Sequence, residues 1–273
     1  MVHRPRSRPH ARPPQTGGHR VSARSSPQRE GGAPRHGLAR VLSKAGICSR
    51  TEAARRVLDG RVAVDGRVVR DPEFPVVLER QRVTLDGQSI SAVRRVYLAL
   101  NKPRGLVTTV RDEQGRDTVY RCFDGAGLPW LAPVGRLDKA SEGLLLFSND
   151  PEWAARLTDP ATGPLKTYRV QVDGLPDAVQ LARMREGIED DGERLAVHSV
   201  EVLRHGERTA WLEIVLDEGR NRHIRRLLQV LGLEVLRLVR VAIGPLALGE
   251  LGKGQWRELN EDDLARLAAH SST

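Results

Sequence analysis

Hydrophobic positions near the start of the chain recur at helical intervals. Gly46 is a plausible end for a first helix, whose apolar residues are Leu38, Val41, Leu42 and Ala45. Ser49 is suited to cap a second helix, because Glu52 follows three residues later as in a capping box. The second helix is predicted to end at Gly60. The pattern therefore indicates two short helices in succession.

The spacing then changes to strict alternation. The stretch RVAVDGRVV, residues 61–69, alternates around Asp65 and Gly66, which is a hairpin signal. Two helices and a small sheet predict a first folded domain over residues 37–92. Residues 1–36 then form a tail, and residues 93–273 form a second domain.

Strand-like runs dominate the second domain, and few helices separate them. Such an order is typical of an α+β fold with a mainly antiparallel, mixed sheet. The predicted strands are 96–102, 130–135, 143–148, 167–172, 194–203, 210–216 and 236–243. The predicted helices are 151–159, 176–188, 221–232 and 261–269, the last with Asn260 as its cap.

Charge is distributed unevenly along the chain. The net charge is +9, and residues 1–36 hold eight arginines against the single acid Glu30, which gives 8 − 1 = +7 and leaves +2 for the rest. We expect this arginine-rich tail to be disordered, because it has little apolar surface to bury. It suggests a polyanionic partner, and the alternative is a solvated leader without a role.

Other compositional signals exclude several classes of protein. No apolar run approaches the length of a membrane span, and the first residues lack the apolar stretch of a secretory signal. The tail is rich in arginine like a mitochondrial transit peptide, but its proline and glycine content argues against the required helix. The two cysteines, Cys48 and Cys122, show neither metal-ligand spacing nor a disulfide framework, so a reducing cytoplasm is expected.

Four stretches of the second domain carry candidate chemistry. In NKPRG (101–105), Lys102 sits on a turn stiffened by proline. In VGRLDKASEGLLLFSND (134–150), Asp138 lies between two cations that would keep it ionised, just before an apolar strand. This acid is either an ordinary turn residue or a lone reactive carboxylate. A glycosidase would need a second acid, for which Glu142 is the nearby candidate.

The other two stretches combine an aromatic residue and arginines. In LKTYRVQV (165–172), Tyr168 lies between cations and serves either base stacking or cross-strand packing. DEGRNRHIRRLLQVLG (217–232) gathers cations at a helix start, where they oppose the helix dipole unless a carboxylate or phosphate binds there. These cations are Arg220, Arg222, Arg225 and Arg226.

Basic residues also gather on or between the helices of the first domain. They form either a solvated face or a nucleic-acid contact surface. The stretch SKAGICSRTEAARRVLDGRVAVDG resembles the S4 RNA-binding domain over most of residues 37–85. The resemblance implies binding of structured RNA through phosphates and shape. The candidate contact residues are Arg40, Lys44, Arg50, Arg55, Arg56 and Arg61.

In this order, the four stretches resemble the motifs of the RsuA-type, S4-containing pseudouridine synthases. The resemblance covers residues 37–260, with Ser141 where the family usually has Thr and His223 where it usually has Gln or Glu. It implies that Asp138 is the catalytic acid, acting as a nucleophile at C1′ or as a base at C2′. It further implies that Tyr168 stacks on the uracil and that Arg225 pairs with Asp138 and lowers its pKa.

The resemblance also bears on substrate and partners. Lys102, Arg136 and Arg222 would hold the site or the RNA backbone, and no cofactor or metal is required. The substrate would be ribosomal RNA, with the large-subunit (23S, RluB-type) enzymes the most similar, and the enzyme would act as a monomer without an evident protein partner. Two alternatives stay open: a non-catalytic S4-domain protein of ribosome assembly, and an RNA or nucleoside glycosidase.

Overall fold

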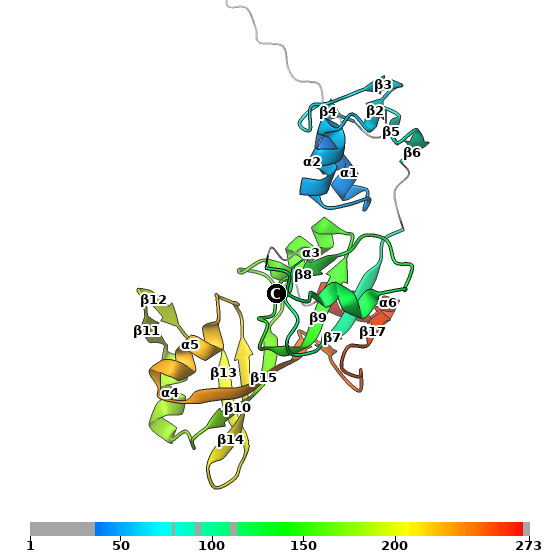
Figure 1. Ribbon diagram of the computed structural model, residues 1–273. Helices are drawn as coiled ribbons and strands as arrows, with labels where there is room; N and C mark the ends of the chain where they lie inside the picture. Colours follow the sequence, from blue (N-terminus) through cyan, green and yellow to red (C-terminus); the bar gives the residue numbers. More distant parts are fainter. Residues whose placement is uncertain (1–35, 78–79, 91–93, 110–113, 270–273) are drawn as a thin grey trace, which may run out of the picture. The chain divides into compact units, whose positions relative to one another are not determined.

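The computed structural model describes residues 36–77, 80–90, 94–109 and 114–269 (Figure 1). The predicted tail lies outside these ranges except for His36, which opens the first strand. The domain boundary predicted after residue 92 also lies outside them.

Two helices and a small sheet form the first folded part of the chain. The helices are α1 (Leu38–Lys44) and α2 (Arg50–Leu58). The backbone N–H of Glu52 donates a 3.1 Å hydrogen bond to the hydroxyl of Ser49, so the predicted N-cap is confirmed. Apolar side chains of both helices form a core with the sheet, so this part has its own hydrophobic centre.

The predicted hairpin is formed by β2 and β3 and lies at one edge of a sheet whose antiparallel strands are ordered β3-β2-β5-β6. Asp65 and Gly66 have φ angles of 51° and 81°. Two successive residues with positive φ are the geometry of a type I′ turn, which explains the Asp-Gly pair. The strands of this part are β1 (His36–Gly37), β2 (Val62–Val64), β3 (Arg67–Val68), β4 (Pro75–Val76), β5 (Val83–Leu85) and β6 (Gln88–Ser89).

A nine-stranded sheet forms the centre of the second part, in the order β13-β14-β10-β15-β9-β7-β17, with β16 beside β15 and β8 beside β9. Among the strand pairs of the described residues, β15 and β9 alone run parallel, so the predicted α+β fold with a mainly antiparallel sheet is confirmed. The strands are β7 (Tyr97–Lys102), β8 (Ala132–Val134), β9 (Glu142–Ser148), β10 (Lys166–Asp173), β13 (Ser199–His205), β14 (Thr209–Leu216), β15 (Glu234–Ile243), β16 (Leu246–Ala247) and β17 (Trp256–Glu258).

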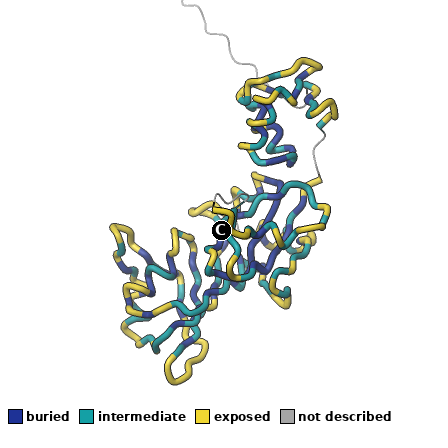
Figure 2. Tube along the Cα trace, viewed as in Figure 1, coloured by how far each residue is buried: buried dark blue, intermediate teal, exposed yellow. Residues whose placement is uncertain are grey.

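Strand β9 is buried along its whole length and separates two cores (Figure 2). Leu145 and Phe147 pack into the larger core, whereas Leu144 and Leu146 pack into the other. Because side chains alternate along a strand, the continuous apolar run GLLLFS fits a strand covered on both faces. Helices α4 (Ala178–Glu186) and α5 (His223–Val230) contribute to the larger core, and α3 (Pro151–Thr158) and α6 (Glu261–Ala269) to the other.

Some predicted elements need correction. The run 194–203 is not one strand, because β12 (Glu193–Leu195) pairs with β11 (Ile188–Asp190) in a separate hairpin and β13 starts afresh at Ser199. A 3-10 helix, η1 (Val119–Phe123), was not predicted. The Asn260 cap is confirmed, because its side chain accepts a 2.8 Å hydrogen bond from the N–H of Asp263. Within the described ranges, no helix has the length and apolar character needed to cross a membrane.

Candidate active site

A cavity of about 200 Å³ lies where the β8–β9 connection, β10, β15 and the start of α5 meet. Residues from three of the four stretches with candidate chemistry line this cavity, namely 134–150, 165–172 and 217–232. Six cations line it, and Asp138 is the only acid among its described lining residues. The structure thus brings together five of the predicted site residues, namely Arg136, Asp138, Tyr168, Arg222 and Arg225.

Asp138 is half-buried in the turn that leads into β9. Its carbonyl oxygen accepts hydrogen bonds from the N–H of Ser141, at 3.0 Å, and from Nζ of Lys102, at 3.1 Å. The preceding residue, Leu137, is buried, and its carbonyl accepts a 2.7 Å bond from the hydroxyl of Thr108. Hydrogen bonds therefore fix the backbone on both sides of the carboxylate.

Lys102 was predicted to contact RNA or to hold the site, and the RNA contact requires a correction. Its side chain is fully buried, at 0% exposure, and lies outside the cavity. Its ammonium group donates to the carbonyls of Pro103, Asp138 and Ser141 at 3.1, 3.1 and 2.9 Å. Burial lowers its pKa to about 8, against the opposite effect of Asp138 and Glu142. In this position Lys102 cannot reach RNA. Its hydrogen bonds instead connect the 101–105 stretch to the turn that contains Asp138.

Tyr168 lies on β10 and is buried, with part of its surface on the cavity. It faces Arg240 of β15 in the antiparallel ladder, immediately after a β-bulge. Residues opposite each other in such a ladder point to the same face of the sheet. The two interpretations of Tyr168 are therefore compatible, since the ring belongs to the core and also forms part of the cavity wall.

Arg225 does not form the predicted ion pair with Asp138. No such pair occurs in the described part of the chain, and the guanidinium instead donates to the carbonyl of Ala140 at 3.1 Å and, more weakly, to that of Val235 at 3.5 Å. Its Nε atom is buried without a hydrogen-bond partner. Burial and the neighbouring Arg222 lower the pKa of Arg225, and Asp138 acts in the opposite direction.

The arginines around the start of α5 differ in their surroundings. Arg226 is held by carboxylates, with Nε 2.6 Å from Asp190 and a second ion pair to Glu193. Arg220 pairs with Glu218 at 2.7 Å. Arg222 caps the helix in the left-handed region with φ 50°, an uncommon backbone conformation for a residue other than glycine. The sequence predicted that an anion offsets the cations at the start of α5. At Arg220 and Arg226, this anion is a carboxylate of the protein itself.

His223 also lines the cavity, which the sequence alone did not settle. It is 2% exposed, and neither ring nitrogen has a hydrogen-bond partner of acceptable geometry. Burial lowers its pKa, and the nearby carbonyl of Ala196 offsets part of this shift. His223 is therefore a neutral imidazole in the cavity wall at ordinary pH.

Comparisons with known proteins agree with this geometry. Residues 37–81 match the S4 domain, and residues 96–230 match the RNA pseudouridylate synthase family. An uncharacterised RNA pseudouridine synthase of Aquifex aeolicus is 39% identical over 230 residues, which cover 84% of this chain and 92% of the relative. The chain belongs to the RNA pseudouridine synthase family. Members of this family are isomerases.

Two further proteins resemble this pseudouridine synthase. An uncharacterised RNA pseudouridine synthase of Rickettsia prowazekii is 35% identical over 230 residues, covering 84% of this chain and 96% of the relative. A crystal structure of a pseudouridylate synthase superposes with a TM-score of 0.60 at 26% identity, covering 85% of this chain and 99% of the other. Both likenesses extend over the S4 part and the synthase part together.

The predicted RNA-binding cations of the S4 domain differ in their local partners. Arg55 and Arg56 both pair with Glu52 at 2.9 Å, Arg50 pairs with Glu73, and Arg61 makes a two-bond contact with Asp86. Such exposed pairs contribute little to stability, so their exchange for RNA phosphates would cost little. Arg40 is exposed, and Lys44 is half-buried at the end of α1. Their role in RNA binding stays a prediction.

Glu142 is excluded as a second acid of the cavity. Its carboxylate is buried and receives Arg237 at 3.0 Å and Lys253 at 2.7 Å. It does not line the cavity with Asp138. The described residues thus give the cavity one carboxylate, where a two-carboxylate glycosidase would need two.

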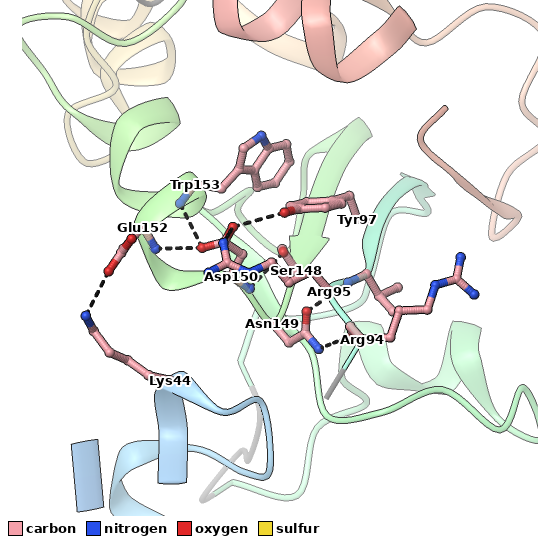
Figure 3. Close-up of polar contacts among 10 residues, drawn as sticks. Lys44, Arg94, Arg95, Tyr97, Ser148, Asn149, Asp150, Glu152 and Trp153 are labelled. Atoms are coloured by element: carbon pink, nitrogen blue, oxygen red, sulfur yellow. Dashed lines mark hydrogen bonds and ion pairs between the residues drawn. The ribbon is translucent and has the colours of Figure 1, made fainter. Parts of the chain in front are cut away.

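The Asn-Asp pair that closes the Asp138 motif forms a structural clamp that sequence reasoning did not assign (Figure 3). Asp150 caps α3 by accepting from the backbone N–H groups of Glu152 and Trp153, and it also binds Arg95 and the hydroxyl of Tyr97. Asn149 accepts from the N–H of Val96 at 2.9 Å and donates to the carbonyl of Arg94 at 2.9 Å. The pair thus joins the end of β9 to the segment that enters β7.

Proposed function

We propose that this pseudouridine synthase isomerises one specific uridine in structured ribosomal RNA, with large-subunit RNA favoured, and that Asp138 is its single catalytic carboxylate. One observation carries the proposal: Asp138 is the only acid among the described residues that line a cavity with six cations. A positively charged cleft attracts a polyanion such as RNA. The S4 domain supports a large, structured RNA.

The reaction needs an ionised carboxylate but no second acid. The N1–C1′ bond of uridine breaks, the uracil turns, and C5 bonds to C1′, after which C5 loses its proton and N1 carries one. Asp138 serves either as the nucleophile at C1′ or as the base that removes the C2′ proton. In both cases, the hydrogen-bonded turn presents the carboxylate to the ribose, and the cations of the same cavity attract the RNA.

Tyr168 supplies the wall against which the base is held. The target nucleotide must leave its helix to reach the cavity, which costs a few kcal/mol of stacking and pairing. An aromatic ring returns about 1–3 kcal/mol by stacking on the extruded base. Leu137 and Leu227 are buried in the core beside the site and help to keep water from C1′.

Pseudouridine mapping of ribosomal RNA from cells with and without this protein tests the proposal. We expect the loss of one large-subunit modification, restored by the parent protein and by Asp124→Asn, which removes an exposed carboxylate in the turn after η1. Asp138→Asn should not restore it. A lost modification in transfer RNA instead would refute the ribosomal substrate, and an unchanged map would favour the non-catalytic assembly protein.

A further inference from the structure

We propose that Lys166 and Arg240 form a phosphate-binding subsite inside the cavity, which takes a backbone phosphate next to the extruded uridine. Neither residue was among the predicted site residues. The inference rests on the proposed function, since it assigns part of the cavity to the RNA backbone. It is carried by the placement of the two cations, by their missing carboxylate partners, and by a buried guanidinium nitrogen without a hydrogen bond.

The sheet register places both side chains on the cavity. Lys166 and Tyr168 are two residues apart on β10 and share a face of the sheet, and Tyr168 stands opposite Arg240 on β15. On β15, Ile243 pairs with Lys166, and Arg240, three residues earlier, pairs with Tyr168. Because the β-bulge between these two pairs shifts the register, both Ile243 and Arg240 line the cavity. Bulges commonly re-aim side chains beside active sites.

Neither cation has a carboxylate partner among the described residues. Nζ of Lys166 donates to the carbonyl of Asp217 at 3.2 Å, and Nε of Arg240 donates to the carbonyl of Leu144 at 2.7 Å. The Nη2 atom of Arg240 is buried and makes no hydrogen bond. Arg240 is only 5% exposed, so little of this charge faces bulk solvent.

The two cations also act on each other. Burial lowers the pKa of Lys166 and Arg240 lowers it further by repulsion, whereas the charge of Asp217 acts in the opposite direction without forming an ion pair. A buried charge is costly unless it is paired, and two neighbouring like charges add to this cost. Elsewhere, the fold pairs even partly exposed arginines with carboxylates, such as Arg237 with Glu142 and Arg257 with Asp263. Because neither Lys166 nor Arg240 has such a pair among the described residues, we infer that a ligand supplies the negative charge at this position.

Phosphate fits this pair better than a carboxylate of the protein does. The guanidinium fork can hold two oxygens of one phosphate, and the lysine adds a compact point charge. Asp138 is the only acid that lines the cavity in the described part of the chain, and no ion pair links it to either cation. Because Tyr168 is the neighbour of both cations on the shared sheet face, a phosphate bound here would be next to a base stacked on that ring.

Binding of small ligands tests the subsite independently of the RNA target. The probes are uridine 5′-monophosphate, uridine 3′-monophosphate, inorganic phosphate and uridine, titrated by ligand-observed NMR into the full chain. Lys166→Gln should weaken the phosphorylated ligands roughly tenfold while leaving uridine within twofold, because a charge-assisted contact is lost. Lys166→Arg should recover most of the affinity.

Arg169→Gln is the matched control, since Arg169 is exposed on the same strand, pairs with Glu213 and does not line the cavity. Arg240→Lys keeps the buried charge but removes the fork, and it should weaken the same ligands. Unchanged binding of all phosphorylated probes by Lys166→Gln, with the parent binding them, would overturn the subsite.

Kinetics on ribosomal RNA then separate the two proposals. Lys166→Gln should raise KM with kcat within twofold, and should lower the log–log salt slope of RNA affinity by roughly 0.7, the value for one single-strand phosphate contact. If no ribosomal RNA is modified but the nucleotide probes still depend on Lys166, the ribosomal substrate is wrong and the subsite stands. If kcat falls and KM and the salt slope stay unchanged, Lys166 does not bind RNA phosphate.

Discussion

The Nη2 atom of Arg225 lies 3.1 Å from the carbonyl oxygen of Ala140, two residues beyond Asp138. The arginine of α5 is thus connected to the turn of the catalytic candidate through its backbone rather than through its carboxylate. Within the described residues no ion pair engages the carboxylate of Asp138, which under the proposed function acts on the ribose. We therefore expect Arg225 to act as a positioning residue, because its guanidinium joins the turn to Val235 of β15.

Arg225→Ala should therefore reduce turnover more than it reduces stability. A double-mutant cycle with Asp138→Ala should give a coupling in the free energy of unfolding below about 1 kcal/mol, because the two charges form no direct pair and Asp138 is half-buried. Urea unfolding of the four proteins measures this coupling. A coupling of about 3 kcal/mol or more would show that a buried ion pair forms in solution after all.

Asp138→Asn should abolish product formation and leave RNA affinity within a fewfold of the parent. The substitution keeps nearly the same shape but removes the only negative charge that the described lining residues contribute to the cavity. Tritium release from uridine-labelled RNA measures turnover, and filter binding measures affinity. Turnover within tenfold of the parent would exclude Asp138 as the catalytic acid. Asp124→Asn provides the matched loss of charge at an exposed position.

Lys102→Met should lower the free energy of unfolding by about 2–4 kcal/mol, because one buried and two partly buried carbonyl groups lose their common donor. RNA affinity should stay within twofold, since Lys102 is fully buried. Lys139→Met makes the same change at an exposed turn position and is expected to leave stability nearly unchanged. A selective loss of RNA affinity in Lys102→Met, with full stability, would restore the original prediction of an RNA contact.

Local signals explain which parts of the fold could be predicted from the sequence. The caps at Ser49 and Asn260 and the Asp65-Gly66 turn are decided by neighbouring residues, and the structure confirms all three. The run 194–203 was misjudged because its division into two strands depends on pairing with β11 and β14. Pairing of this kind is a property of the whole sheet.

The candidate site shows the same division between local and distant information. The motif resemblance indicated Asp138, Tyr168 and Arg225, and the structure places all three on one cavity. It could not indicate Lys166 and Arg240, because each is a single cation in a strand and only the bulged register brings them to the same face. Nor could the motif resemblance show that Arg226 is held in ion pairs, because its carboxylate partners come from the distant β11–β12 hairpin.

His223 should make the stability of the protein depend on pH below about 6.5. Burial lowers its pKa in the folded state, so the unfolded chain binds the proton more readily between the folded and unfolded pKa values. The free energy of unfolding therefore decreases as the pH falls from the unfolded-state pKa of His223 through its folded-state pKa. Above the unfolded-state pKa, His223 causes no loss of stability. His223→Gln removes the titrating group and should be less sensitive to acid.

Urea unfolding at pH 7.5 and pH 5.0 measures the effect as the difference between the two proteins, so that other titrating groups cancel. His205→Gln replaces an exposed histidine on β13 and should lose as much stability as the parent does over the same interval. Parallel losses in the parent and His223→Gln would show that His223 is not buried as a neutral group. If uridine 5′-monophosphate reduces the acid loss in the parent only, the ligand supplies the hydrogen bonds that both ring nitrogens lack in the described structure.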